Sequence, residues 1–450
     1  MTFRFGDRRR AAVLLHMSSV RDPLGRGGRA IVDWLAEAGF ALWQFLPVGP
    51  TGPDGSPYWA RSDAAGNPAF IDQTELPARG GDEERAFCTA AASWLEDFAC
   101  FEVLSAVHGG VPWWEWPVPL RDREPAALAV FRGKHGDALA QVRYTQFCFD
   151  WQWRRLHAYA RQRGVSFFGD LPFYVAPESF ETWSQRAQFQ LDAAGRARAV
   201  GGVPPDYFSE LGQLWGNPLY DWDVMRRDGF AFWRTRVGHQ LARVDLLRLD
   251  HFRALAAHWA VPAGAQDARG GHWQRTPGWA LLRRLRAELG ELPLVAEDLG
   301  VITPDVEDLR FGFDLPGMRV VQFAFDGASD NPHLPHMHTR HSVVYSGTHD
   351  NDTTLGWYRG LDAGTARRVD FVLGAEPGAM PATMIRTVLA SVARVAVLPM
   401  QDVLALDSRA RFNTPGTTVG NWSWQLPEGA LTRELARHFR ALNSTYGRAR

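Results

Sequence analysis

The stretch DLLRLDHF (residues 245–252) begins with apolar residues and ends in charged and polar ones. Apolar runs of this length are typical of strands that are buried on both faces of a parallel sheet. Seven further runs have the same character, and several of them also end in polar residues. They are AAVLLHM (11–17), ALWQFLPV (41–48), VSFFGDLPF (165–173), LPLVAEDL (292–299), MRVVQFAF (318–325), HSVVYSGTHD (341–350) and VAVLPMQDV (395–403).

Helical patterns lie between these runs. In IVDWLAEAGF (31–40) the apolar residues recur at helical spacing, and Gly39 is a stop signal. A second apolar stripe predicts a helix near 141–163, which ends at Gly164. Eight strands that alternate with helices predict an α/β fold, a (β/α)₈ barrel formed by residues 1–450 as a single catalytic unit.

Two connections are too long for a loop and one helix. We expect an insertion subdomain at 49–164 after the second strand, including the barrel helix near 141–163. We expect another insertion at 174–244 after the third strand, including a Gly/Pro/aromatic loop at 202–222. Such insertions lie on the face where these barrels carry their sites.

Composition excludes several classes of protein. Lys and Arg total 49 and Asp and Glu total 50, so the net charge of −1 argues against binding nucleic acid through a basic surface. No apolar run approaches the roughly 18 residues of a membrane span. We expect no signal peptide, and the three cysteines form no CxxC motif, so we expect a soluble cytoplasmic protein.

Polar residues follow at least five of the predicted strands. Because the carboxyl ends of barrel strands meet on one face, we expect these side chains to converge there. Asp402 could equally be the N-cap of a helix. The strand ends in question carry Asp170, Arg248, Asp250, His251, Glu297, Asp298, His349, Asp350, Asn351, Asp352, Gln401 and Asp402.

Two of these strand ends suit acid–base chemistry. Arg248 and Asp250 are two residues apart in a strand, so both side chains face the same way. A guanidinium favours the ionised carboxylate, which makes Asp250 a candidate nucleophile, although a purely structural ion pair is the alternative. Glu297 lies within an apolar run, where desolvation raises the pKa of a carboxyl group and suits a general acid. A helix cap is the alternative for Glu297.

The segment GTHDND (347–352) admits two readings. Its oxygen-rich side chains could bind Ca²⁺ or Mg²⁺, and its histidine a transition metal. No second cluster with ligand spacing accompanies it, so we expect no metal site. A carboxylate pair with a third acid fits glycoside chemistry better: one nucleophile, one acid/base and one group that grips the sugar.

At these motifs the chain resembles glycoside hydrolase family 77, the 4-α-glucanotransferases or amylomaltases of the α-amylase clan. The similar segments run in family order and cover nearly the whole chain. They are SPYWARSDAAGNPAFID (56–72), GDLPFYVAPES (169–179), GVPPDYFSELGQLWGNPLYDW (202–222), RLDHFRAL (248–255), AEDLGVITPDVEDLR (296–310), FGFDLPGMRVVQFAFDG (311–327), YSGTHDNDTTLGWY (345–358) and MQDVLALDSRARFNTPGTTVGNWSWQL (400–426).

The resemblance implies roles for matched positions. Asp250 corresponds to the nucleophile, Glu297 to the acid/base and Asp350 to the transition-state stabiliser. The resemblance also implies a set of substrate-binding residues. These are Tyr58, Asp170, Tyr207, Phe208, Gln213, Trp215, Arg248, His251, Asp298, His349 and Asn421.

The implied function is transfer of a segment of a 1,4-α-glucan to the 4-hydroxyl of an acceptor glucan or glucose, by a retaining double displacement. The resemblance implies maltooligosaccharide and glucan substrates, no cofactor, no metal, no nucleic-acid or membrane partner, and a monomer or homodimer. A retaining α-glucan hydrolase and a catalytically inactive glycan-binding protein are the alternatives.

Overall fold

Eight parallel strands form the centre of the molecule. The computed structural model describes residues 5–6, 8–205, 209–376 and 378–449. The strands pair in the order β10-β11-β12-β1-β2-β3-β6-β9, and each coincides with one of the eight apolar runs, so the predicted (β/α)₈ barrel is confirmed. Their bounds are β1 Arg10–Leu14, β2 Leu42–Gln44, β3 Ser166–Leu171, β6 Leu246–Leu249, β9 Leu294–Ala296, β10 Gly317–Val320, β11 Ser342–Tyr345 and β12 Val395–Pro399.

Burial on both faces explains the uninterrupted apolar runs. In β12 every residue from Val395 to Pro399 is buried. Val395 and Val397 belong to the cluster inside the barrel. Ala396 and Leu398 belong to the larger cluster between the barrel and its helices. Because successive side chains in a strand point to opposite faces, alternate residues of β12 supply the two clusters.

The barrel is nearly closed at the seam between β9 and β10. The backbone N–H of Ala296 donates a hydrogen bond of 2.9 Å to the carbonyl oxygen of Pro316. The N–H of Met318 donates to Oδ1 of Asp298 at 2.6 Å. A side-chain carboxylate therefore accepts a hydrogen bond from the edge of β10, at the end of the barrel where β9 stops.

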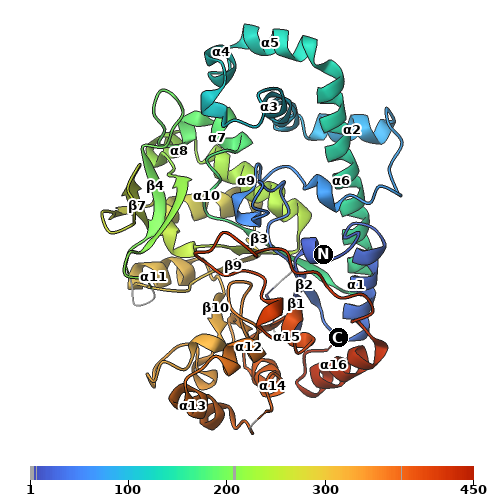
Figure 1. Cartoon of the computed structure of the whole chain (residues 1–450), viewed down its shortest axis with the longest axis vertical. Coiled ribbons are helices and arrows are strands. Elements are labelled where there is room, and N and C mark those ends of the chain that lie inside the picture. Colours follow the sequence, from blue (N-terminus) through green and yellow to red (C-terminus); the bar gives the residue numbers. More distant parts are fainter. Residues whose placement is uncertain (1–4, 7, 206–208, 377, 450) are drawn as a thin grey trace.

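Helices surround the sheet, and others lie in the long connections (Figure 1). Helix α1 ends two residues before Gly39, which has φ +77°, and α6 ends directly before Gly164, which has φ +76°. The helix bounds are α1 Arg26–Glu37, α2 Asp82–Ala90, α3 Leu95–Val107, α4 Val118–Arg121, α5 Pro125–Lys134, α6 Gly136–Arg163, α7 Phe180–Ser184, α8 Trp222–Arg227, α9 Ala231–Arg243, α10 Gly278–Leu289, α11 Pro304–Gly312, α12 Thr354–Arg359, α13 Ala363–Leu373, α14 Ala382–Ala390, α15 Met400–Val403 and α16 Arg433–Thr445.

The chain between β2 and β3 builds a second core at the top of Figure 1. Helices α2 to α6 belong to this stretch. Trp113 and Phe101 are fully buried in this core, together with Trp183 of α7. Part of the chain's high aromatic content therefore fills this core, and a larger part fills the cluster around the barrel. None of the helices in the described ranges combines the length and the apolar character that a membrane span requires.

A four-stranded antiparallel sheet covers another side of the barrel. Its order is β5-β4-β7-β8, formed by Ala199–Val203 (β4), Gln213–Pro218 (β5), Ala257–Pro262 (β7) and His272–Arg275 (β8). The expectation that 202–222 is a loop was wrong, because part of it forms β5 and the end of β4. Strand β4 pairs with both β5 and β7, and the pairing with β7 joins segments far apart in sequence. Local composition gives no signal of such pairing.

Candidate active site

Arg248 links two carboxylates at the ends of β3 and β6. Its Nη1 donates to Oδ2 of Asp170 at 2.7 Å, and its Nη2 donates to Oδ1 of Asp250 at 2.6 Å. Asp170 lies opposite Arg248 in the parallel register of the two strands. The Arg248 and Asp170 side chains are almost completely buried, whereas 28% of the Asp250 side chain is exposed. Asp250 is therefore the most accessible member of this group.

Tyr58 extends this hydrogen-bonded chain from the segment after β2. Its hydroxyl donates to Oδ2 of Asp170 at 2.7 Å. Burial raises the pKa of Asp170, and the Arg248 guanidinium opposes that shift. The ring of Tyr58 stacks on the imidazole of His349, with 5.2 Å between ring centroids and 14° between planes. Tyr58 thus joins the ends of β3 and β11.

Glu297 follows β9 directly and is held by two backbone amides. Its Oε2 accepts a hydrogen bond of 2.7 Å from the N–H of His251, and its Oε1 accepts one of 3.0 Å from the N–H of Leu299. Burial raises the pKa of Glu297 to about 8, and the negative charge of Asp250 is the next cause. Glu297 therefore carries a proton at neutral pH, as expected from its apolar surroundings.

Asp350 lies on the turn that follows β11. Its Oδ1 accepts a hydrogen bond of 2.6 Å from Nδ2 of Asn413. Its Oδ2 lies 3.4 Å from Nε2 of His349. Asn413, which belongs to the segment after β12, thus holds Asp350 although the two residues are 63 positions apart in the sequence.

Asp402 holds both ends of the loop that carries His349 and Asp350. Its carboxylate accepts hydrogen bonds from the Ser346 hydroxyl at 2.6 Å and from the Thr354 N–H at 2.7 Å. The Thr354 hydroxyl adds a third at 2.6 Å. Asp402 is not the N-cap of a helix: it lies within α15, and the N-cap of α12 is Thr353. Asp402 instead accepts from the first residue of α12. Burial raises the pKa of Asp402.

The antiparallel sheet reaches the site through Trp215 of β5. The Trp215 ring packs edge-on against the His251 ring, with 4.7 Å between centroids. Its Nε1 donates to Oε1 of the exposed Gln213 at 3.0 Å. Burial lowers the pKa of His251 to about 4, so this imidazole is neutral at pH 7. Tyr207 and Phe208, also predicted to bind substrate, lie outside the described residues.

Two predicted substrate-binding residues have protein partners in the structure. Asp298 accepts a hydrogen bond from Met318 and lies within 3.4 Å of Arg310 and Arg319. These contacts place Asp298 in the seam of the barrel. Oδ1 of Asn421 accepts from the Thr414 N–H at 2.9 Å, and its Nδ2 donates to the carbonyl of Thr417. The Asn421 amide therefore shapes its own loop.

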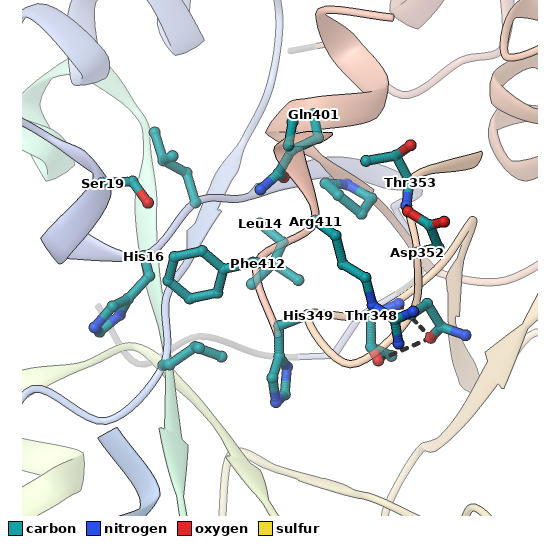
Figure 2. A pocket seen from close by; sticks show the side chains of 15 residues that line it. Leu14, His16, Ser19, Thr348, His349, Asp352, Thr353, Gln401, Arg411 and Phe412 are labelled. Carbon is teal, nitrogen blue, oxygen red and sulfur yellow. Dashed lines mark hydrogen bonds between the residues drawn. The ribbon is translucent and has the colours of Figure 1, made fainter. Parts of the chain in front are cut away.

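A pocket opens beside His349, between the ends of β1, β11 and β12 (Figure 2). Arg411 and Phe412 come to it from the segment after β12, and neither was singled out from the sequence. Within the described residues, no three His, Cys, Asp or Glu side chains group closely enough to hold a metal ion. The labelled lining residues are Leu14, His16, Ser19, Thr348, His349, Asp352, Thr353, Gln401, Arg411 and Phe412.

The fold and the site define a (β/α)₈-barrel enzyme whose acids meet at the carboxyl ends of the strands. The family profile described as 4-alpha-glucanotransferase, glycoside hydrolase family 77, matches residues 15–85 and 77–432. The chain belongs to this family.

Individual relatives agree with that assignment. A 4-alpha-glucanotransferase of Thermus thermophilus is 44% identical, over 96% of this chain and 97% of its own length. One from Synechocystis sp. is 38% identical, over 98% of each chain. The amylomaltase of Streptococcus agalactiae, solved in complex with acarbose, has a TM-score of 0.93 and 31% identity, covering 98% of this chain and all of that one.

Proposed function

We propose that this 4-α-glucanotransferase moves a segment of a 1,4-α-glucan to the 4-hydroxyl of another glucan or of glucose, with Asp250, Glu297 and Asp350 as its catalytic residues. The observation that carries the proposal is the contrast between two carboxyl groups. Asp250 is paired with a buried guanidinium, whereas Glu297 has a pKa raised to about 8. An ionised nucleophile beside a protonated acid is the arrangement that a retaining glycoside mechanism requires.

In the first half of the reaction, Asp250 attacks the anomeric carbon of the donor. Glu297 gives its proton to the departing glycosidic oxygen, and the donor's non-reducing part becomes bonded to Asp250 as a β-ester. The bond that breaks is the α-1,4 bond, and the departing chain leaves with the proton of Glu297. Arg248 holds Asp250 through a hydrogen bond of 2.6 Å and so fixes the attacking carboxylate.

In the second half, Glu297 changes from acid to base. Ester formation removes the negative charge of Asp250, which is one of the causes that raise the pKa of Glu297. The pKa of Glu297 therefore falls when the intermediate forms, and the carboxylate can take the proton of an incoming 4-hydroxyl. Two inversions restore the α configuration, so an α-1,4 bond is exchanged for another.

Asp350 supplies negative charge where positive charge develops on the sugar ring. His349 lies beside it and is stacked on Tyr58, so these two rings form a wall of the site. We assign His349, Arg248 and Asp170 to the sugar ring that is attacked, and Tyr58 to the acceptor side. We propose that His251, Gln213 and Trp215 also contact the substrate, at the part of the site that faces β5.

In this proposal the insertions favour transfer to a sugar acceptor over hydrolysis. The segments 49–164 and 174–244 act as insertion subdomains beside the barrel mouth, and the described residues of 202–222 lie over the bound glucan. Trp215 supports this placement, because its ring contacts His251, the residue after Asp250. An aromatic cover excludes water and offers acceptor sugars a surface to stack on.

A retaining hydrolase would use the same three acids, so product analysis is the decisive experiment. The purified chain is incubated with maltotriose as the only substrate. A ladder of longer and shorter maltooligosaccharides, with little net gain in reducing ends, is the expected result. Conversion of maltotriose only to glucose and maltose, with a rising number of reducing ends, would establish the hydrolase instead.

We further propose a cytoplasmic monomer or homodimer. All three cysteines are free, and Cys100 and Cys148 are buried, which suits a reducing compartment. The three proposed catalytic acids lie in one chain, so one chain supplies all of them.

A further inference from the structure

Asp350 is more accessible than the other two proposed catalytic acids, Asp250 and Glu297. It lies on a turn, and 44% of its side chain is exposed. A side chain with this freedom loses rotamer entropy when it is held in one orientation. Stabilising charge on a sugar ring depends on such a fixed orientation, because preorganised groups need no rearrangement as the charge develops.

Asn413 provides a fixed partner for this carboxylate. Its Nδ2 donates a hydrogen bond of 2.6 Å to Oδ1 of Asp350. Asn413 itself is only 8% exposed. The short distance and the negative acceptor make this a charge-assisted hydrogen bond, the stronger kind.

Arg411 fixes the two residues relative to each other. Its Nη2 donates to the carbonyl oxygen of Asp350 at 2.7 Å, and its Nε donates to the carbonyl oxygen of Asn413 at 2.8 Å. One guanidinium therefore ties both main chains together. The backbone of the 411–413 segment is fixed further by the N–H of Trp422, which donates to the carbonyl of Phe412 at 2.8 Å.

We propose that Asn413 is a positioning residue, whose amide N–H holds the Asp350 carboxylate in the orientation that transition-state stabilisation requires. The inference rests on the proposed function, in which Asp350 has that role. An amide suits the task because it donates a hydrogen bond without adding charge. A lysine or arginine would neutralise Asp350, and an aspartate would repel it.

Two substitutions at position 413 test the proposal. Asn413→Ala removes the donor, and Asn413→Asp replaces it with a negative charge on a side chain of nearly the same size. Both variants should lose about tenfold to a hundredfold in kcat with donor KM within about threefold of the parent, since charge-assisted hydrogen bonds act at this scale. Ser423→Ala, which loses a hydroxyl bonded to Gly420 in the same loop, is the control and should keep its kcat.

A double variant separates positioning from a general structural role. If Asn413 acts through Asp350, adding Asn413→Ala to Asp350→Ala should cost no further activity with a glycosyl fluoride donor. Equal losses in both backgrounds would overturn the positioning role and leave that of Asp350 intact. Near-normal activity of Asp350→Ala alone would instead refute the proposed role of Asp350, and this inference with it.

Discussion

The backbone N–H of His251 donates a hydrogen bond of 2.7 Å to Oε2 of Glu297. His251 directly follows Asp250, and its backbone lies in the left-handed region, with φ 49°. Few residues other than glycine adopt this conformation, and such strained positions cluster at functional sites. The peptide that links Asp250, the proposed nucleophile, to His251 thereby holds Glu297, the proposed acid. The distance between the Asp250 and Glu297 carboxyl groups therefore depends on the backbone conformation at His251.

The protonation of Glu297 predicts the alkaline limb of the pH–rate profile. The pKa of Glu297 is about 8, so its protonated fraction falls as the pH rises through that value. Because the acid form is needed for the first half of the reaction, kcat/KM for maltotriose should decline above about pH 8. Steady-state rates between pH 6 and 10 check this. A decline that persists unchanged for a glycosyl fluoride donor, which needs little protonation, would contradict it.

Removing the charge of Asp250 should lower the pKa of Glu297. Asp250 is the second-ranked cause of the raised pKa, after burial. In Asp250→Asn the pKa should therefore fall from about 8, though burial keeps it above the ordinary value for glutamate. Titration of the Glu297 carboxyl carbon by NMR measures the change, with the Glu297→Gln variant to assign the signal. An unaltered titration would mean that the two groups are not electrostatically coupled.

Trp215 should favour sugar acceptors over water. Trp215→Ala removes an aromatic surface next to His251, and stacking losses of about 1–3 kcal/mol per ring are plausible by analogy with base–aromatic stacking. The ratio of longer oligosaccharides to net hydrolysis should fall, because water needs no such surface. Trp273→Ala is the control, since this exposed tryptophan lies on β8 at the opposite edge of the same sheet. Equal ratios in both variants would count against the proposed role of 202–222.

Asp402 should matter for stability as well as for rate. Asp402→Ala leaves the buried groups of Ser346 and Thr354 without their acceptor, which should cost about 2–4 kcal/mol in the free energy of unfolding. The loop that carries Asp350 would loosen, so kcat should fall too. Denaturant unfolding and maltotriose kinetics measure both. A variant with the expected loss of stability but a normal kcat would show that this loop is positioned without Asp402.

The barrel could be predicted from the sequence because both faces of each strand are buried. The run 395–399 is apolar throughout, since alternate residues face the barrel interior and the surrounding helices. The antiparallel sheet gave no comparable signal. Its strand β4 contains Gly201 and Gly202, and its partner β7 lies far along the chain. Pairing of that kind depends on tertiary contacts that a local pattern does not record.

Within the site, the sequence predicted which types of residue are present better than it predicted where their side chains point. Glu297 and Asp298 are neighbours in one strand-end motif, yet Glu297 accepts from His251 and Asp298 from Met318 in the seam. Side chains of adjacent residues diverge, and which one faces the mouth depends on where the strand ends. Asn413 was missed because an asparagine in a loop has no pattern that marks it as the partner of an acid.

The most direct test of the central claim is to trap the intermediate on Asp250. Glu297→Gln, given a maltosyl fluoride donor, should form the ester but release it slowly, because no base activates the acceptor. Peptide mass spectrometry after acid quenching should find one added maltosyl group on the peptide that contains Asp250. Fluoride release with an unmodified Asp250 peptide, and a product of inverted anomeric configuration, would contradict the double-displacement account.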